Sequence, residues 1–313
     1  MPNKPIPDLS SCTMFNMMYY LSCLFIRYSG LATADRMLSR DKITIVMYHN
    51  PDPVTFEKHV RYLVKKYHPV SFSDLSELLR QEHHTVIPAN PLLITIDDGW
   101  KENYGLLPVI RKYNIRPLLF LTAQLIDTER GFWWTQCPPG EVEYLKRLPT
   151  LEARAWLRDK YGHEPEKEYP GERQVLNMQE INEMKPYVDF GLHSSFHPVL
   201  TTCTREEKRE EIMQGKLLLE QMLGTEIRAF SYPNGNYDDE CIHLLIEAGI
   251  EVARTTDAGR NHRASDPYRL KITGVSDTGS VSKLVAELTG IPLFLQYLFF
   301  HRSLDGKKKN ISL

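Results

Sequence analysis

The sequence predicts an α/β protein in which about seven parallel β-strands form a (β/α) barrel within a single domain. Apolar, strand-like runs alternate with amphipathic helical patterns from residue 43 to about residue 275. The strand-like runs are almost uniformly apolar, which is typical of parallel strands that are covered on both faces. Seven or eight such units in one chain favour a closed barrel over an open sheet.

The bulk composition is that of an ordinary globular protein. The chain has 313 residues, of which 42% are hydrophobic and 25% charged. The formal net charge of −2 and the sequence pI of about 6.6 lack the basic excess of a nucleic-acid-binding protein, so no nucleic-acid partner is expected. Five cysteines, an odd number without a CxxC spacing, argue against a disulfide framework and against a cysteine metal site.

Strand and helix patterns alternate regularly in the first part of the predicted barrel. The strand patterns fall at 43–49, around Val70, at 92–97 and at 116–122. The helix patterns fall at 56–67, at 73–81 with Ser73 as the expected cap, and at 105–114. Each helix supplies the crossover that successive parallel strands need.

The alternation stops at residues 128–175, which are rich in proline, glycine and aromatic residues. We predict an insertion over one face, with a helix near 150–160. The alternation then returns with strands at 188–193, 226–233, 251–256 and 268–275. The intervening helices are one capped by Asn177, a long one at 204–224 that ends on Gly224, and one at 238–249.

The two ends of the chain lie outside this pattern, so we assign residues 43–290 to the barrel domain. Residues 1–42 contain the apolar run 14–26, which is shorter than the roughly 20 residues of a spanning helix. We predict an amphipathic helical segment that packs on the domain or rests on a membrane surface, with a signal anchor as the alternative. Without a clear cleavable signal peptide, the expected location is cytoplasmic or peripheral on the inner membrane.

Residues 291–313 are predicted to form a C-terminal helix followed by a basic tail. The run 291–302 carries an aromatic stripe, and Lys307–Lys309 follow it. The pattern is typical of a docked terminal helix. A peripheral membrane contact is the alternative.

Polar residues follow most of the predicted strands. His49 ends the first strand, Asp97 and Asp98 end the strand at 92–97, and His193 and His197 follow the strand at 188–193. In a barrel, chemistry takes place where strands end and the following loops begin. These carboxylates and imidazoles are therefore expected to meet at one mouth of the barrel.

Asp97 and Asp98 are adjacent at the end of an apolar strand, where each would lose water and repel the other. Such a pair needs a compensating cation, metal or proton. His193 and His197 stand four residues apart, so they can share one ion. Two histidines and one aspartate leave coordination positions free for water and substrate, and the second aspartate can then act as a base. We therefore predict a divalent metal as the compensating group.

Three segments resemble signature motifs of the polysaccharide deacetylases, the chitooligosaccharide-deacetylase-like carbohydrate esterases of family four. They are TIDDG (95–99), HSSFHP (193–198) and FSYPNGNY (230–237). The flanking segments 45–63 and 255–272 resemble the exopolysaccharide-type branch of that family. The resemblance implies a distorted (β/α) barrel. It also implies a metal-dependent hydrolase that removes N-acetyl groups from the sugars of a polysaccharide or its precursor.

The resemblance also implies roles for individual residues. Asp97 would be the general base, and Asp98, His193 and His197 would hold the metal, most often Zn²⁺, with Co²⁺, Ni²⁺ or Mn²⁺ as alternatives. The backbone N–H of Asn234 would face the developing oxyanion. Residues placed to contact the carbohydrate substrate are Tyr232, Pro233 and Trp134, and Trp133 beside it; a local hydrophobic cluster is the alternative for these aromatic residues.

Two features depart from the family pattern. Many members carry an arginine at the position of Ser231, so the group that orients Asp97 is not evident; Arg269 and Lys271 are candidates. Many members also supply the acid as a histidine in an L-x-H pattern, where this chain reads RLKITG. His49 is the replacement candidate, with His262 behind it. The alternative for His49 is a structural histidine bonded to the backbone.

Two other functions fit part of the pattern. A non-haem iron oxygenase also uses two histidines and one carboxylate, although this chain places the aspartate far from the histidine pair. A non-catalytic carbohydrate-binding relic of the fold would explain the missing arginine and histidine. The intact set of two aspartates and two histidines argues against such decay.

Overall fold

The computed structural model describes residues 9–80, 88–171 and 173–292, with side chains from residue 17 onward. The chain divides into two compact units. One comprises Met1–Arg40 and Thr278–Leu313, and the other comprises Asp41–Asp277.

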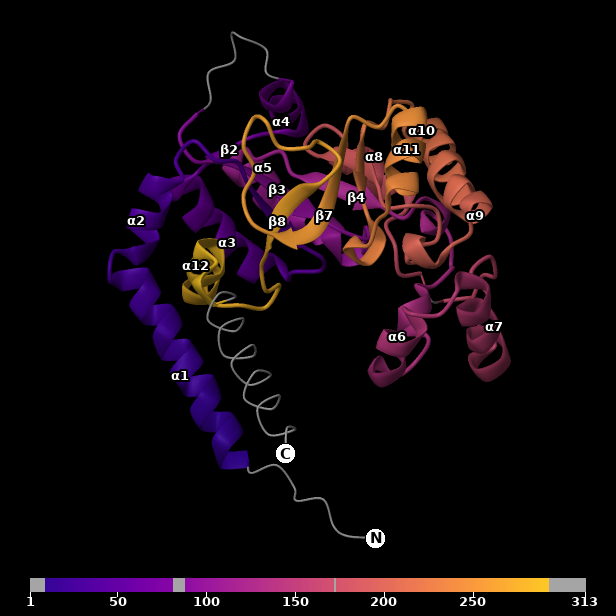
Figure 1. Ribbon diagram of the computed structural model, residues 1–313, viewed down its shortest axis with the longest axis horizontal. Coiled ribbons are helices and arrows are strands. Elements are labelled where there is room, and N and C mark those ends of the chain that lie inside the picture. Colours follow the sequence, from indigo (N-terminus) through magenta and orange to yellow (C-terminus); the bar gives the residue numbers. More distant parts are fainter. Residues whose placement is uncertain (1–8, 81–87, 172, 293–313) are drawn as a thin grey trace, which may run out of the picture. The chain divides into compact units, whose positions relative to one another are not determined.

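The second unit contains the predicted barrel (Figure 1). All strand pairs are parallel, and the order β1-β8-β7-β6-β5-β4-β3 closes through the pairing of β3 with β1. These seven strands form the barrel, and the short β2 pairs with the beginning of β3. The strands are β1 (Thr44–Tyr48), β2 (His68–Pro69), β3 (Pro91–Ile96), β4 (Leu118–Leu121), β5 (Asp189–Leu192), β6 (Ala229–Ser231), β7 (Val252–Ala258) and β8 (Leu270–Gly274).

The described helices of this unit are α3 (Pro53–Lys66), α4 (Phe72–Leu79), α5 (Leu107–Tyr113), α6 (Pro139–Leu145), α7 (Thr150–Tyr161), α8 (Met178–Met184), α9 (Arg205–Arg209), α10 (Gly215–Leu223) and α11 (Asp239–Glu247). Most of them lie around the strands, whereas α6 and α7 project away from the strands (Figure 1). Asn177 caps α8 through a capping box, and Gly224 ends α10 in the left-handed region at φ 61°, as the sequence predicted. The expected cap Ser73 is wrong, because Ser71 and Asp74 form the capping box of α4.

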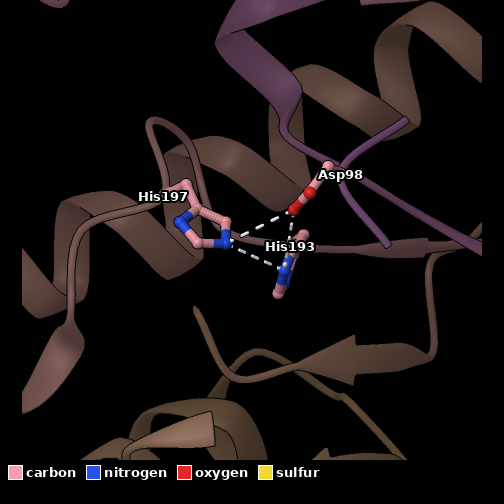
Figure 2. Close-up of side chains that lie close together, drawn as sticks. All are labelled: Asp98, His193 and His197. Atoms are coloured by element: carbon pink, nitrogen blue, oxygen red, sulfur yellow. Dashed lines mark hydrogen bonds and ion pairs between the residues drawn. The ribbon is translucent and has the colours of Figure 1, made fainter. Parts of the chain in front are cut away.

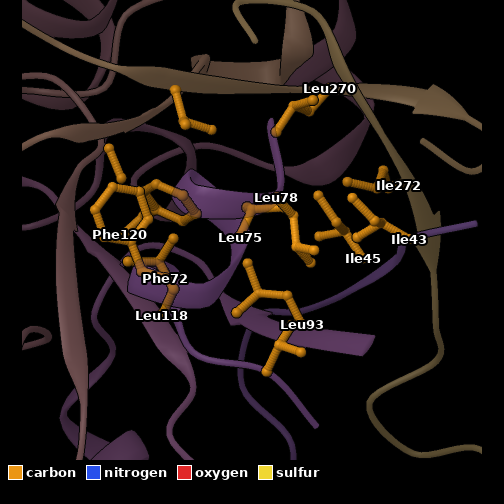
Figure 3. Close-up of a cluster of buried hydrophobic side chains, with 13 residues drawn as sticks. Ile43, Ile45, Phe72, Leu75, Leu78, Leu93, Leu118, Phe120, Leu270 and Ile272 are labelled. Atoms are coloured by element: carbon orange, nitrogen blue, oxygen red, sulfur yellow. The ribbon is translucent and has the colours of Figure 1, made fainter. Parts of the chain in front are cut away.

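The barrel interior is an apolar core (Figure 3). Alternate residues of each strand face inward, and the inward residues include Ile45, Leu93, Ala229 and Val252. Side chains of α4 join this core near the end where the strands begin, since the backbone N–H of Phe72 donates to Asp189 at the start of β5. The same alternation continues toward the opposite end of the strands. There, the inward-facing residues include the polar residues Asp97, Ser231 and Arg254.

The predicted insertion contains α6 and α7. These helices share a small core of their own, in which Cys137, Leu145 and Leu157 are buried. The segment before α6 carries Trp133 and Trp134 in a 3-10 turn. The insertion therefore folds as a helical pair that is attached to the barrel by an aromatic segment.

The first unit contains α1 (Leu9–Tyr28), α2 (Leu31–Leu38) and α12 (Val281–Thr289). Cys23 and Ile26 of α1 are buried with Ala286 of α12. The sequence analysis placed residues 281–289 in the barrel domain, whereas α12 groups with α1 and α2. No helix among the described residues is long and apolar enough to cross a membrane. The predicted basic tail lies outside the described residues.

Candidate metal centre

Polar side chains from four strand ends meet in one cavity of about 190 Å³. Asp97 and Asp98 follow β3, His193 follows β5, and His197 lies in the loop after β5. Asp97, Asp98 and His193 are buried, and His197 is partly buried. The predicted convergence of the two aspartates and two histidines at the barrel mouth is therefore observed.

Asp98, His193 and His197 form a compact set of ligand atoms (Figure 2). Asp98 Oδ1 lies 3.4 Å from His193 Nε2 and 3.5 Å from His197 Nε2, and the two Nε2 atoms are 3.0 Å apart. Ligand atoms in a tetrahedral zinc site, at bond lengths of about 2.0–2.1 Å, lie about 3.3–3.4 Å from one another. The observed triangle therefore fits a divalent cation of that size.

Neighbouring groups fix which atom of each ligand faces the cation position. The carbonyl oxygen of Ser231 can only accept, so His193 donates Nδ1–H to it at 2.7 Å and leaves Nε2 with a free electron pair. The indole N–H of Trp100 donates to Asp98 Oδ2 at 2.9 Å and leaves Oδ1 for the ion. Such supporting bonds orient metal ligands in proteins.

The aromatic segment of the insertion holds the second histidine. The Trp133 indole N–H donates to the His197 carbonyl at 3.0 Å. The ring centroid of Trp134 lies 4.4 Å from that of His197. Both tryptophans also line the cavity. The insertion is therefore part of the site rather than a remote addition.

The backbone at the site adopts left-handed conformations, with positive φ, that non-glycine residues seldom take. Asp98, Ser194 and His197 have φ of 72°, 61° and 61°. Gly99 follows with φ 76°, and a Cβ at that position would lie 2.5 Å from Leu121 Cδ2. Left-handed backbone at non-glycine residues is strained and clusters at functional sites.

The electrostatics of the cluster leave the ligand electron pairs available at neutral pH. Burial alone would raise the pKa of the Asp98 carboxyl, but its interactions with the neighbouring His193 and His197 imidazoles hold that pKa well below its usual range. Burial, reinforced by the neighbouring His193, lowers the pKa of His197 to about 3. An anionic carboxylate and a neutral imidazole are the forms that coordinate a cation.

Asp97 has a partner that the sequence analysis missed. The guanidinium Nη2 of Arg254, which is 2% exposed, donates to both carboxylate oxygens of Asp97 and, at 2.7 Å, to Ser231 Oγ. Ser231 and Arg254 are register partners on the adjacent strands β6 and β7. The arginine expected at position 231 is thus replaced by one on the neighbouring strand.

The candidates Arg269 and Lys271 for orienting Asp97 are wrong. Arg269 pairs with Asp239 and Asp266 and is 44% exposed, and Lys271 is an exposed residue of β8. The sequence signal for Arg254 is that it is a charged residue directly after the apolar pair Val252 and Ala253, at an inward position of β7; this signal does not identify its partner.

A second missed residue, Glu211, supports the loop between the histidines. Its buried carboxylate accepts the backbone N–H groups of Ser195 and Phe196 at 2.9 and 2.8 Å, and Arg154 of the insertion approaches it at 3.4 Å. Burial raises the pKa of this carboxyl. Glu211 lies in a π-helical turn, Glu210–Gln214, that interrupts the helix predicted at 204–224.

The remaining predicted residues lie in different places. His49, Asn234, Tyr232 and Trp134 line the cavity, whereas Pro233 is buried and does not. The His49 backbone is held by Asp277 and Asn103, and the residue is exposed at the cavity. His262 does not line this cavity, and its Nδ1 accepts the backbone N–H of Ala264 at 3.2 Å.

Comparison with known proteins agrees with this geometry. The sequence profile of the polysaccharide deacetylase family matches residues 86–253, which is more than half of the chain. The "Putative polysaccharide deacetylase YxkH" of Bacillus subtilis (strain 168) is 22% identical over 247 residues, covering 75% of this chain and 72% of YxkH.

Solved structures share the fold. The Streptococcus pyogenes deacetylase PplD in complex with acetate has a TM-score of 0.59 at 17% identity, covering 79% of this chain and 98% of PplD. IcaB from Ammonifex degensii has a TM-score of 0.59 at 19% identity, covering 80% of this chain and 97% of IcaB. The family match, together with the curated relative, shows that the chain is a deacetylase and belongs to the polysaccharide deacetylase family.

Proposed function

We propose that the chain is a metal-dependent hydrolase that removes N-acetyl groups from the N-acetylated sugars of a polysaccharide or its precursor. The proposal rests on one observation: a set of metal ligands and a separately held carboxylate lie side by side in one cavity. The ligand triangle of Asp98, His193 and His197 fits a cation, and Asp97 lies beside it, with its Oδ2 3.9 Å from His193 Nε2. A metal site with an adjacent, separately held carboxylate suits hydrolysis by an activated water.

Each residue then has a defined task. A divalent ion bound there would polarise the acetyl carbonyl and make a nearby water more acidic. Asp97 takes the proton from the attacking water, while Arg254 holds its carboxylate in place. The backbone N–H of Asn234 donates to the oxyanion of the tetrahedral intermediate. His49 gives a proton to the departing amine nitrogen, because without that proton the nitrogen would have to leave as an unstable anion.

The donor set supports zinc as the ion. Two imidazole nitrogens and one carboxylate oxygen are ligands that zinc accepts, and a site with three protein ligands keeps a position open for water. Co²⁺, Ni²⁺ and Mn²⁺ accept the same donors and would occupy the site when zinc is absent.

The cavity wall supports a carbohydrate substrate. Trp134 presents aromatic surface to the cavity beside the metal position. Tyr232 is also part of the cavity wall, but its side chain is buried. Aromatic faces of this kind bind the apolar faces of sugar rings. Tyr232 is itself fixed, because its hydroxyl donates to the Tyr268 carbonyl at 3.1 Å and its ring stacks on Tyr237.

Acetate release from N-acetylglucosamine oligomers by the zinc-loaded protein tests the proposal. We expect release that a chelator abolishes and added zinc restores. Asp97→Asn should bind zinc as the wild type does yet lose about 10²–10⁴-fold in turnover, since it removes the base and keeps the ligands.

Wild-type turnover by Asp97→Asn would contradict the base assignment. Sugar binding without any acetate release would instead identify a carbohydrate-binding relic, and oxygen consumption with Fe²⁺ would identify an oxygenase.

A further inference from the structure

The first unit carries a concentration of exposed apolar side chains. Sixteen large hydrophobic side chains are exposed among the described residues, and nine of them lie between Met17 and Leu38, on or next to α1 and α2. The exposed fractions reach 63% at Phe25, 70% at Met37 and 84% at Leu38. Contiguous exposed apolar surface of this kind marks an interaction site.

The exposed residues of α1 form a stripe opposite its packed face. Met17, Leu21 and Tyr28 follow one another at helical spacing, with Phe25 beside them, and we call these four the α1 stripe. Cys23 and Ile26, on the other side of the helix, are buried against α12. The stripe contains no charged residue. A helix that is apolar on both faces needs a second apolar environment.

A second copy of the chain and the chain's own C-terminal segment are two alternatives to a membrane, and both fit the α1 stripe poorly. A stable interface between two copies engages about 20–30 residues of any type on each side, and 14 residues are exposed between Met17 and Arg40, the nine apolar ones included. The described part of the C-terminal segment lies on the other side of α1, because Ile291 packs in the cluster of Cys23 and Ile26, away from the stripe.

The charges of the chain favour a lipid surface. Within α1 from Met17 onward, Arg27 is the one charged side chain, and its guanidinium donates to Ser282 Oγ at 3.0 Å, outside the stripe. The sequence adds Lys307–Lys309 at the end of the same unit. An apolar helix face and a basic cluster are the two features that together hold a protein stably on an anionic bilayer.

We propose that the first unit binds an anionic membrane surface, with α1 in the plane of the bilayer and the α1 stripe inserted among the lipids. The proposal fits the finding that no described helix is long and apolar enough to span a membrane. It stands independently of the proposed deacetylation, because it concerns the other compact unit.

Flotation of the full chain with lipid vesicles tests the proposal. We expect the wild type to float with vesicles that contain phosphatidylglycerol and to bind phosphatidylcholine vesicles more weakly. Leu21→Asp/Phe25→Asp should lower the partition coefficient by about tenfold or more, since it places two charges in the apolar layer. The matched control is Leu217→Asp/Ile246→Asp, which changes two exposed apolar residues of the barrel unit and should float like the wild type.

Three results would overturn the proposal. The first is a wild type that does not float, and the second is a Leu21→Asp/Phe25→Asp variant that floats as the wild type does. The third is a wild-type dimer in sedimentation that this variant dissociates, which would show that a second copy covers the stripe. Unchanged acetate release and thermal unfolding of the barrel unit would show that the variant is folded.

Discussion

At the scale of single residues, the site depends on how buried charges are compensated. Asp97 and Asp98 stand side by side, but their charges are balanced separately, by Arg254 for Asp97 and by the proposed cation for Asp98, which His193 and His197 would bind together with it. The sequence was sufficient to predict the aspartates and histidines, because each follows an apolar strand. It could not reveal Arg254 as the partner of Asp97, because 157 residues separate them and only the closure of the barrel joins them.

Replacing Arg254 tests this division of charge. Arg254→Met should abolish most acetate release and lower the free energy of unfolding by about 3–5 kcal/mol, because it leaves a buried carboxylate uncompensated. Steady-state assays and urea unfolding measure the two effects. The double variant Ser231→Arg/Arg254→Ser supplies a guanidinium from the adjacent strand β6. It should recover part of the acetate release and part of the free energy of unfolding.

The surface variant Arg269→Met is the matched control for Arg254→Met, and it should behave like the wild type. Full activity in Arg254→Met would show that Asp97 needs no guanidinium.

The acid is a second prediction at this scale. His49→Gln should slow acetate release from N-acetylglucosamine oligomers by about 10²-fold or more, because the amine leaves only after protonation. It should leave the hydrolysis of 4-nitrophenyl acetate nearly unchanged, because a nitrophenolate departs without a proton. The control His262→Gln should affect neither reaction. Equal losses on both substrates in His49→Gln would contradict the role of acid.

At the scale of elements, the sequence predicted the barrel strands closely, because apolar runs bounded by polar residues are a local property. The expected strand at 92–97 is β3 at Pro91–Ile96, and the expected strand at 188–193 is β5 at Asp189–Leu192. The helix at 204–224 was predicted as continuous, but a π turn interrupts it. The turn brings Glu211 under the histidine loop, and a Cβ at Gly215 would lie 2.9 Å from Ser195 Oγ. Such contacts are long-range, so helical periodicity could not predict them.

The π turn therefore has a testable role in metal binding. Glu211→Gln should weaken zinc binding by about 10–100-fold, since partners of the ligands are worth that much. Glu210→Gln, at the exposed neighbouring position in the same turn, should bind zinc like the wild type. A competition assay with a chromogenic chelator measures both affinities. Equal zinc affinities in the two variants would show that Glu211 stabilises the fold without positioning the metal loop.

At the scale of the whole molecule, the barrel brings together groups that lie far apart in the chain. Asp98 and His193 are 95 residues apart, and the closed order of seven strands places both at one mouth. The alternation of strands and helices predicted that closure. It could not predict that α12 packs with α1 in a separate unit, or that one face of α1 stays exposed, because both depend on contacts between the two ends of the chain.

Titration of the metal-free protein with Zn²⁺, followed by calorimetry, tests the central claim most directly. Asp98, His193 and His197 should together hold one ion per chain in the wild type. His193→Ala and His197→Ala should each lose that binding while the barrel stays folded by circular dichroism. A wild type that takes up no zinc, or histidine variants that take up one ion per chain with wild-type affinity, would contradict the account.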